Sequence, residues 1–252
     1  MYIHSPPIKK QNVSEKLMNV NAITRLPPKA PGKGIKSENG CIYFQDDKLG
    51  LTVGLWEAEP SSIDHVASEV DEFFHIIDGS ATIELANGDI EEITAGQSFV
   101  IPKGLSFRWV QNDKMRAFYM RHKKSETALN NTVDAIGIIR LDSSDPIEEI
   151  SIADTSQFLG VVPKHFKHDY YKDAANQFLV AMWNSDPFER DVAPFNRHEL
   201  MCILAGSVTL SDGADYEETF KAGDVIFVPF GAPYKWKSSE YLSKFYCIVM
   251  PN

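Results

Sequence analysis

Two glutamates, Glu72 and Glu199, are the residues of this sequence best placed to do chemistry. Each begins an apolar stretch that predicts a β-strand, on the face expected to point into a β-barrel. A buried carboxylate is costly unless its charge is compensated, and burial raises its pKa. An aromatic hydroxyl, an indole, a basic side chain, a ligand amine or a metal could compensate it. Such a carboxylate either holds a small molecule, acts as a general base, or accepts a purely structural hydrogen bond.

Large apolar side chains are expected on the same face as the two glutamates, by counting every second residue along neighbouring strands. They are Phe74, Phe107 and Trp109 in the first set and Met201, Tyr234 and Trp236 in the second. Mostly apolar walls with a few polar groups are typical of small-molecule sites. They are equally typical of a small barrel whose interior is filled by side chains. Both interpretations stay open at this point.

The elements that must position these residues occur twice along the chain. Shifted by 127 positions, the sequence matches itself without a gap between residues 41 and 122, so that Trp56 falls on Trp183 and Glu72 on Glu199. A unit of this length exceeds the roughly 20 to 50 residues of solenoid repeats. The repeat therefore predicts two copies of one domain with the same topology.

Short apolar or alternating runs separated by turn signals fill each copy, which is typical of a β-sandwich or barrel. The predicted strands of the first copy are 51–58, 72–78, 80–85, 90–94, 98–101, 106–110 and 115–120, and the second copy repeats them. Further strands are predicted over 135–141 and, with a helix as the alternative, over 148–158. We predict an all-β fold of two tandem barrels at 41–122 and 168–252, with a Pro-rich N-terminal arm at 1–40 and a connection at 123–167.

Two spaced motifs carry a family resemblance. The first copy has Glu72-x6-Gly79 and then Gly96-x5-Pro102-x-Gly104, and the second copy repeats both motifs from Glu199 onward. These spacings resemble the signature motifs of the cupin superfamily, whose jelly-roll barrels often hold a metal. With the tryptophans and Tyr119, the pattern is similar to the ureidoglycine-aminohydrolase-like branch, which includes EutQ-type proteins. The resemblance implies a bicupin, and hydrolysis of a C–N bond as its activity, although one scaffold hosts many activities.

The resemblance also implies a metal-ligand set of His-x-His-x(3,4)-Glu and one later histidine. The four positions hold His65, Ala67, Glu72 and Phe107 in the first copy, and Val192, Pro194, Glu199 and Tyr234 in the second. A catalytic divalent metal normally takes at least three protein ligands. We therefore predict no metal cofactor, with a weak divalent site at His65 and Glu72 as the alternative. His65 otherwise binds a ligand or forms a structural hydrogen bond at a strand edge.

The remaining histidines match no ligand position. His75 and His198 are expected to point away from the glutamate face, because neighbouring strand residues alternate between faces. His122, His165 and His168 lie in or near the connection and are expected to be exposed to solvent.

Composition excludes several classes of partner. The net charge is −10 and the pI about 5.2, which disfavours nucleic acid and anionic membranes. The 3 cysteines are too few for a disulfide framework, and Cys202 and Cys247 are predicted to be buried thiols. No signal-peptide core and no apolar stretch long enough to span a membrane is recognised, so a cytoplasmic protein is expected. Exposed strand edges and the arm favour a homodimer.

Two functional hypotheses follow. In the first, the bicupin binds a small nitrogen-containing or carboxylate metabolite in the N-terminal barrel, near His65, Glu72, Phe107 and Trp109. If it is an enzyme, Glu72 is the acid or base, His65 orients the substrate, and the second barrel mainly supports the structure. In the second hypothesis, it is a metal-free binding or structural bicupin without turnover.

Overall fold

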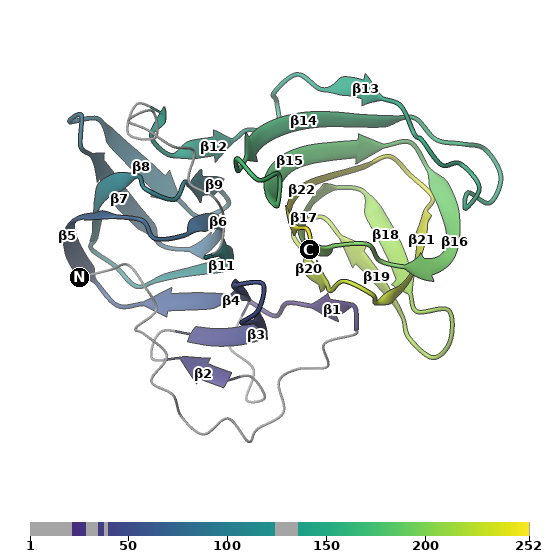
Figure 1. Ribbon diagram of the computed structural model, residues 1–252, viewed down its shortest axis with the longest axis horizontal. Helices are drawn as coiled ribbons and strands as arrows, with labels where there is room; N and C mark the ends of the chain where they lie inside the picture. The colour runs from purple at the N-terminus through teal and green to yellow at the C-terminus, as the bar shows by residue number, and fades with distance from the viewer. Residues whose placement is uncertain (1–21, 29–34, 38–39, 124–135, 252) are drawn as a thin grey trace. The chain divides into compact units, whose positions relative to one another are not determined.

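The computed structural model describes residues 22–28, 35–37, 40–123 and 136–251, and all of their named elements are β-strands (Figure 1). They form two compact units, one made mostly of residues 27–140 and one made mostly of residues 141–251. Among the described residues, no helix is long and apolar enough to cross a membrane. The prediction of an all-β chain with two tandem barrels is confirmed.

The N-terminal barrel consists of a seven-stranded and a four-stranded antiparallel sheet. The larger sheet has the order β12-β9-β6-β11-β4-β3-β2, and the smaller has the order β5-β10-β7-β8. The strands are β2 (Ile35–Ser37), β3 (Gly40–Asp46), β4 (Leu51–Ala58), β5 (Ser61–Ala67), β6 (Asp71–Asp78), β7 (Ser80–Leu85), β8 (Ile90–Thr94), β9 (Ser98–Ile101), β10 (Ser106–Gln111), β11 (Met115–His122) and β12 (Ile139–Leu141).

The C-terminal barrel has the same two-sheet design, seen in green and yellow in Figure 1. Its larger sheet has the order β1-β20-β17-β22-β15-β14-β13, and its smaller sheet has the order β16-β21-β18-β19. The strands are β1 (Thr24–Arg25), β13 (Glu148–Ile150), β14 (His165–Lys172), β15 (Phe178–Ser185), β16 (Phe188–Pro194), β17 (His198–Ala205), β18 (Ser207–Ser211), β19 (Glu217–Lys221), β20 (Val225–Val228), β21 (Pro233–Ser238) and β22 (Leu242–Val249).

The repeat read from the sequence is confirmed strand by strand. From β4 to β11, each strand recurs 127 residues later as one of β15 to β22, and only the end of β18 falls one residue short. The predicted strands of both copies are present. The strands that were not predicted are β1, β2, β3, β5, β14 and β16. The sequence of β5 is too polar to alternate clearly. In the connection, the predicted strands shorten to β12 and β13.

The outermost strands do not follow the repeat. In the C-terminal barrel, the edge of β20 is covered by β1 from the arm, whereas the equivalent edge of β9 is covered by β12 from the connection. Arg25 fixes β1 by donating to the Glu218 carboxylate at 2.6 Å and to the carbonyl of Thr219 at 2.8 Å. The arm thus contains strands, and β1 blocks an edge that would otherwise be open to pairing with another chain.

Candidate functional site

Glu72 lies inside the N-terminal barrel, as predicted, and its partner is a basic side chain. It shares the inner face of β6 with Phe74 and Ile76 and lies directly opposite Arg121 of β11. Arg121 Nε donates to Glu72 Oε1, and both residues are buried. The guanidinium also lies 4.1 Å from the centre of the Tyr119 ring. Burial raises the pKa of Glu72 above its ordinary value, although the charge of Arg121 opposes the shift.

Aromatic rings pack the rest of this interior. Trp56 contacts Trp109 edge to face at 5.7 Å between centres, and Phe74 stacks on Phe99 at 5.3 Å. The predicted residues Phe74, Phe107 and Trp109 all belong to this core. The Trp109 indole donates to Gln111 Oε1 at 2.9 Å. Trp109 is therefore not the indole that donates a structural hydrogen bond to Glu72, because its N–H is already bonded to Gln111.

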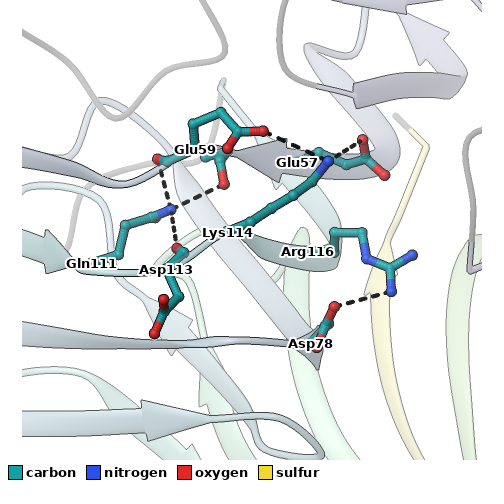
Figure 2. A network of polar contacts seen from close by, with 8 residues as sticks. Glu57, Glu59, Asp78, Gln111, Asp113, Lys114 and Arg116 are labelled. Atoms are coloured by element: carbon teal, nitrogen blue, oxygen red, sulfur yellow. Dashed lines mark hydrogen bonds and ion pairs between the residues drawn. The ribbon is translucent and has the colours of Figure 1, made fainter.

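Gln111 closes one end of the N-terminal barrel through a network of polar contacts (Figure 2). Its Nε2 donates to the carbonyl oxygens of Ala58, Glu59 and Asp113 at 3.1, 2.9 and 3.1 Å. Its side chain is buried, with 3% of the residue exposed. One amide therefore makes four hydrogen bonds, to three carbonyls and to the Trp109 indole.

We expect Gln111→Leu to lower the free energy of unfolding by about 2–4 kcal/mol, because it removes four hydrogen bonds and takes away the partner of the buried Trp109 indole. Urea denaturation followed by tryptophan fluorescence measures the change. The control is Lys114→Ala at the same end of the barrel, where the amine lies 3.7 Å or more from Glu57 and Glu59 (Figure 2). An exposed pair of this kind contributes about 0–1 kcal/mol. Equal effects of the two substitutions would contradict the assigned role of Gln111.

Glu199 occupies the equivalent position in the C-terminal barrel and has two cationic partners. Lys244 Nζ donates to Oε1 at 2.6 Å and Arg197 Nε donates to Oε2 at 2.9 Å. Burial by itself would raise the pKa of Glu199, but the charges of Lys244 and Arg197 outweigh it, so the pKa lies below the ordinary value. Both oxygens of this buried carboxylate therefore already have cationic donors.

Lys244 is surrounded by aromatic rings on the inner face of β22. Its Nζ lies 5.0 Å from the centre of Trp183, 5.2 Å from Trp236 and 5.5 Å from Tyr246. Burial lowers the pKa of Lys244, and the carboxylate of Glu199 opposes that shift. A cation among aromatic faces is stabilised by their quadrupoles. The arrangement holds a fixed positive charge inside the barrel.

In each barrel a cation from the equivalent strand, β11 or β22, neutralises the glutamate, but the two cations occupy different positions along that strand. Arg121 is directly opposite Glu72, whereas the residue directly opposite Glu199 is Ile248. Lys244 comes from four residues earlier on β22 and reaches along the strand. Neither Arg121 nor Lys244 was predicted from the sequence as a partner of the glutamates. Extending the count of every second residue from Tyr119 to Arg121, and back from Tyr246 to Lys244, would have placed both inside.

Of the other predicted site residues, two lie in the core of the C-terminal barrel and one lies on strand β5. Tyr234 and Trp236 lie in the core of the C-terminal barrel with Met201, as expected. His65 belongs to β5, at a register irregularity between Ile63 and Val66, and its side chain lies outside the described residues. The roles assigned to His65 and Glu72 stay predictions.

The arrangement of the described residues does not fit the metal site that cupins often have. In the C-terminal barrel, Val192 and Pro194 are exposed and Tyr234 is buried against aromatic rings, so Glu199 alone remains of the four ligand positions. Within the described parts of the chain, no group of three or more His, Cys, Asp or Glu side chains could hold a metal ion. Lys244 and Arg197 bond both oxygens of Glu199, so this carboxylate does not fit the role of a metal ligand.

Two histidine predictions need correction. His122 is fully buried, and His165 is half-buried against Trp183 and Phe188, so neither is a solvated side chain of the connection. The reason is that β11 extends past its predicted end at residue 120, and that β14, which was not predicted, begins at His165, so both residues belong to the sheets. His75 bonds Ser98 and His198 Nδ1 accepts from the Phe230 N–H, which agrees with structural roles away from the glutamates.

Comparison with known proteins supports the duplication. The model of the EutQ-like cupin domain matches residues 49–119 and again residues 173–246. The chain belongs to the EutQ-like cupin domain family. It is a bicupin, and the three cysteines of this bicupin are free and buried, as predicted for Cys202 and Cys247. Among curated proteins, none matches the bicupin significantly.

Solved structures show the same fold. A protein of unknown function of the DUF861 family from Pseudomonas syringae pv. tomato is 24% identical with a TM-score of 0.77, covering 91% of this bicupin and 100% of that chain. The protein Ylba from E. coli, also DUF861, is 13% identical with a TM-score of 0.54 and 94% of each chain covered. A cupin 2 conserved barrel domain protein from Leptotrichia buccalis is 12% identical with a TM-score of 0.56, covering 85% of the bicupin and 92% of that chain.

Proposed function

We propose that this bicupin binds a small metabolite without a metal and that the C-terminal barrel holds the ligand. The proposal rests on the cationic cluster around Glu199. Lys244 and Arg197 engage both of its oxygens, and a third cation, Arg190, lies 5.7 Å from the ring of Tyr234 in the same barrel. Lys244 and Arg197 together carry one more positive charge than Glu199 balances. Arg190 adds a further cation beside the aromatic walls. That environment suits a small metabolite with a carboxylate or another polar group.

The fixed ammonium of Lys244 supports binding without a metal. It already lies where it can attract a negative group of a ligand, and the surrounding rings keep it desolvated. The proposal places the ligand in the C-terminal barrel, whereas the hypothesis from the sequence placed it in the N-terminal barrel. It retains the ligand class of that hypothesis, a small nitrogen-containing or carboxylate metabolite.

The N-terminal barrel offers a second candidate function, hydrolysis of a C–N bond with Glu72 as general acid or base. The observation in its favour is that burial raises the pKa of Glu72, because a raised pKa makes a carboxylate a stronger general base. The proximity of Arg121, which favours the ionised form, counts against it.

Binding of acetate, glycine and urea tests the proposal, since these probes separate carboxylate from nitrogen chemistry. We expect calorimetry to give the same affinity before and after dialysis against EDTA. Lys244→Met should weaken binding by roughly tenfold to hundredfold, because a charge-assisted hydrogen bond is lost. Circular dichroism checks that the variant is folded, and Lys244→Arg retains the charge. Lys235→Met, on the same barrel, is the control.

His65→Gln is the matched variant of the N-terminal barrel and should leave binding of the probes unchanged. If EDTA abolishes binding and a divalent metal restores it, the proposal of metal-independent binding is wrong. If His65→Gln abolishes binding while Lys244→Met does not, the ligand lies in the N-terminal barrel as the sequence hypothesis had it.

A further inference from the structure

The C-terminal barrel contains a cation that Glu199 does not neutralise. Arg190 of β16 lies directly opposite Trp236 of β21, on the face that carries Tyr234 and Trp236 into the core. Its Nε is buried and has no hydrogen-bond partner. Of the ion pairs formed by described residues, none includes Arg190. Its charge does act on Asp154, but that carboxylate is exposed and bound to Ser156.

A second buried nitrogen without a partner belongs to His165, at the start of β14. Its Nε2 has no hydrogen-bond partner, and its ring contacts Trp183 at 4.9 Å and Phe188 at 5.4 Å between centres. Burial, followed by the charges of Lys244 and Arg190, lowers the pKa of His165 to about 4. The ring is therefore neutral at neutral pH, and in the Nε2–H tautomer it can donate a hydrogen bond.

A segment of the connection covers these two residues. Phe158 pairs with Arg190 as an isolated antiparallel bridge, and the Leu159 and Asp191 amides each donate across the same junction at 2.8 Å. The Phe158 ring lies 6.0 Å from His165 and 5.4 Å from Phe188. Shielding from water strengthens any electrostatic interaction made there.

We propose that Arg190 and His165, with the nearby charge of Lys244, bind one carboxylate group of the ligand. This inference rests on the proposed function and names its ligand class. A buried donor without a partner destabilises the protein, and a carboxylate would satisfy both nitrogens at once. The planar group fits against flat rings and matches two donors with two oxygens, whereas a phosphate would leave further oxygens without donors.

Matched pairs of probes test the inference: acetate against acetamide and benzoate against benzamide, with inorganic phosphate as a third arm. Each pair has nearly the same shape and differs in charge. Calorimetry on the full chain should show that each acid binds roughly tenfold to hundredfold more tightly than its amide. Arg190→Gln should abolish this preference, Arg190→Lys should restore part of it, and His165→Gln should reduce it. Lys237→Gln on β21, an exposed cation of the same barrel, should change nothing.

The outcomes separate the inference from the proposed function. If acids and amides bind equally, or Arg190→Gln keeps the preference while it is folded by circular dichroism, the carboxylate assignment is wrong and small-molecule binding still stands. Tighter binding of phosphate than of both acids would also overturn the choice of carboxylate. If no probe binds at saturating concentration, both proposals fail.

Discussion

Replacing Arg121 with methionine is expected to lower the free energy of unfolding by about 3–5 kcal/mol, because it leaves the Glu72 carboxylate buried without its cation. Lys244→Met should cost less, since Arg197 still holds Glu199. Urea denaturation gives the global change. Because the chain has two barrels, hydrogen exchange of the amides of β6 and β11 shows whether the loss is confined to the N-terminal barrel.

Two further variants make this expectation specific. The double substitution Glu72→Leu with Arg121→Met should recover most of the stability, because a buried ion pair can be replaced by apolar side chains at little cost. Arg116→Met on the same strand removes a pair with Asp78, whose side chain is 60% exposed, and should cost less than about 1 kcal/mol. A loss for Arg121→Met no larger than that of Arg116→Met would show that Glu72 does not depend on Arg121.

The second large effect is expected at Gly79, in the turn between β6 and β7. Its φ is +83°, and an added Cβ would lie 2.5 Å from the carbonyl oxygen of Lys114. Gly79→Ala combines a left-handed backbone, which costs about 1–2 kcal/mol, with a clash against main chain that cannot rotate away. We expect a total loss of about 3 kcal/mol or more, measured by chemical denaturation.

Gly96 provides the matched control for Gly79. Its φ is +86°, nearly the same, but an added Cβ would meet nothing within 4 Å. Gly96→Ala should therefore cost only about 1–2 kcal/mol, the conformational part of the effect. Gly206 and Gly223 repeat the contrast in the C-terminal barrel, because a Cβ at Gly206 would fall on the Tyr241 carbonyl and one at Gly223 would be free. Equal losses at Gly79 and Gly96 would contradict the steric explanation.

Most of the fold could be predicted from the sequence because its determinants are local and present twice. The alternation of apolar residues along β7 and β10 fixes which face is buried, and glycines at equivalent turns fix where strands end. The misses have local causes too. β5 has the polar sequence SSIDHVA, and β1 has only two residues, so neither shows a pattern that can be recognised without its neighbours.

The charged site was only half predictable. The buried positions of Glu72 and Glu199 followed from strand periodicity, and the need for a compensating partner followed from the cost of burying charge. The identity of that partner did not follow, because it depends on strand pairing. Arg121 reaches Glu72 across β11, whereas Lys244 reaches Glu199 along β22 from a position with no cation in the other copy.

By itself, the sequence determined that this protein is two cupin barrels of one design with a glutamate inside each. It did so because repeats, periodicity and turn residues act over a few positions along the chain. Only the tertiary structure decided what surrounds each glutamate: one cation in the N-terminal barrel, and two cations among aromatic rings in the C-terminal barrel. The contacts of Arg121 with Glu72 and of Lys244 with Glu199 join residues 49 and 45 positions apart, at distances set by sheet register and side-chain reach.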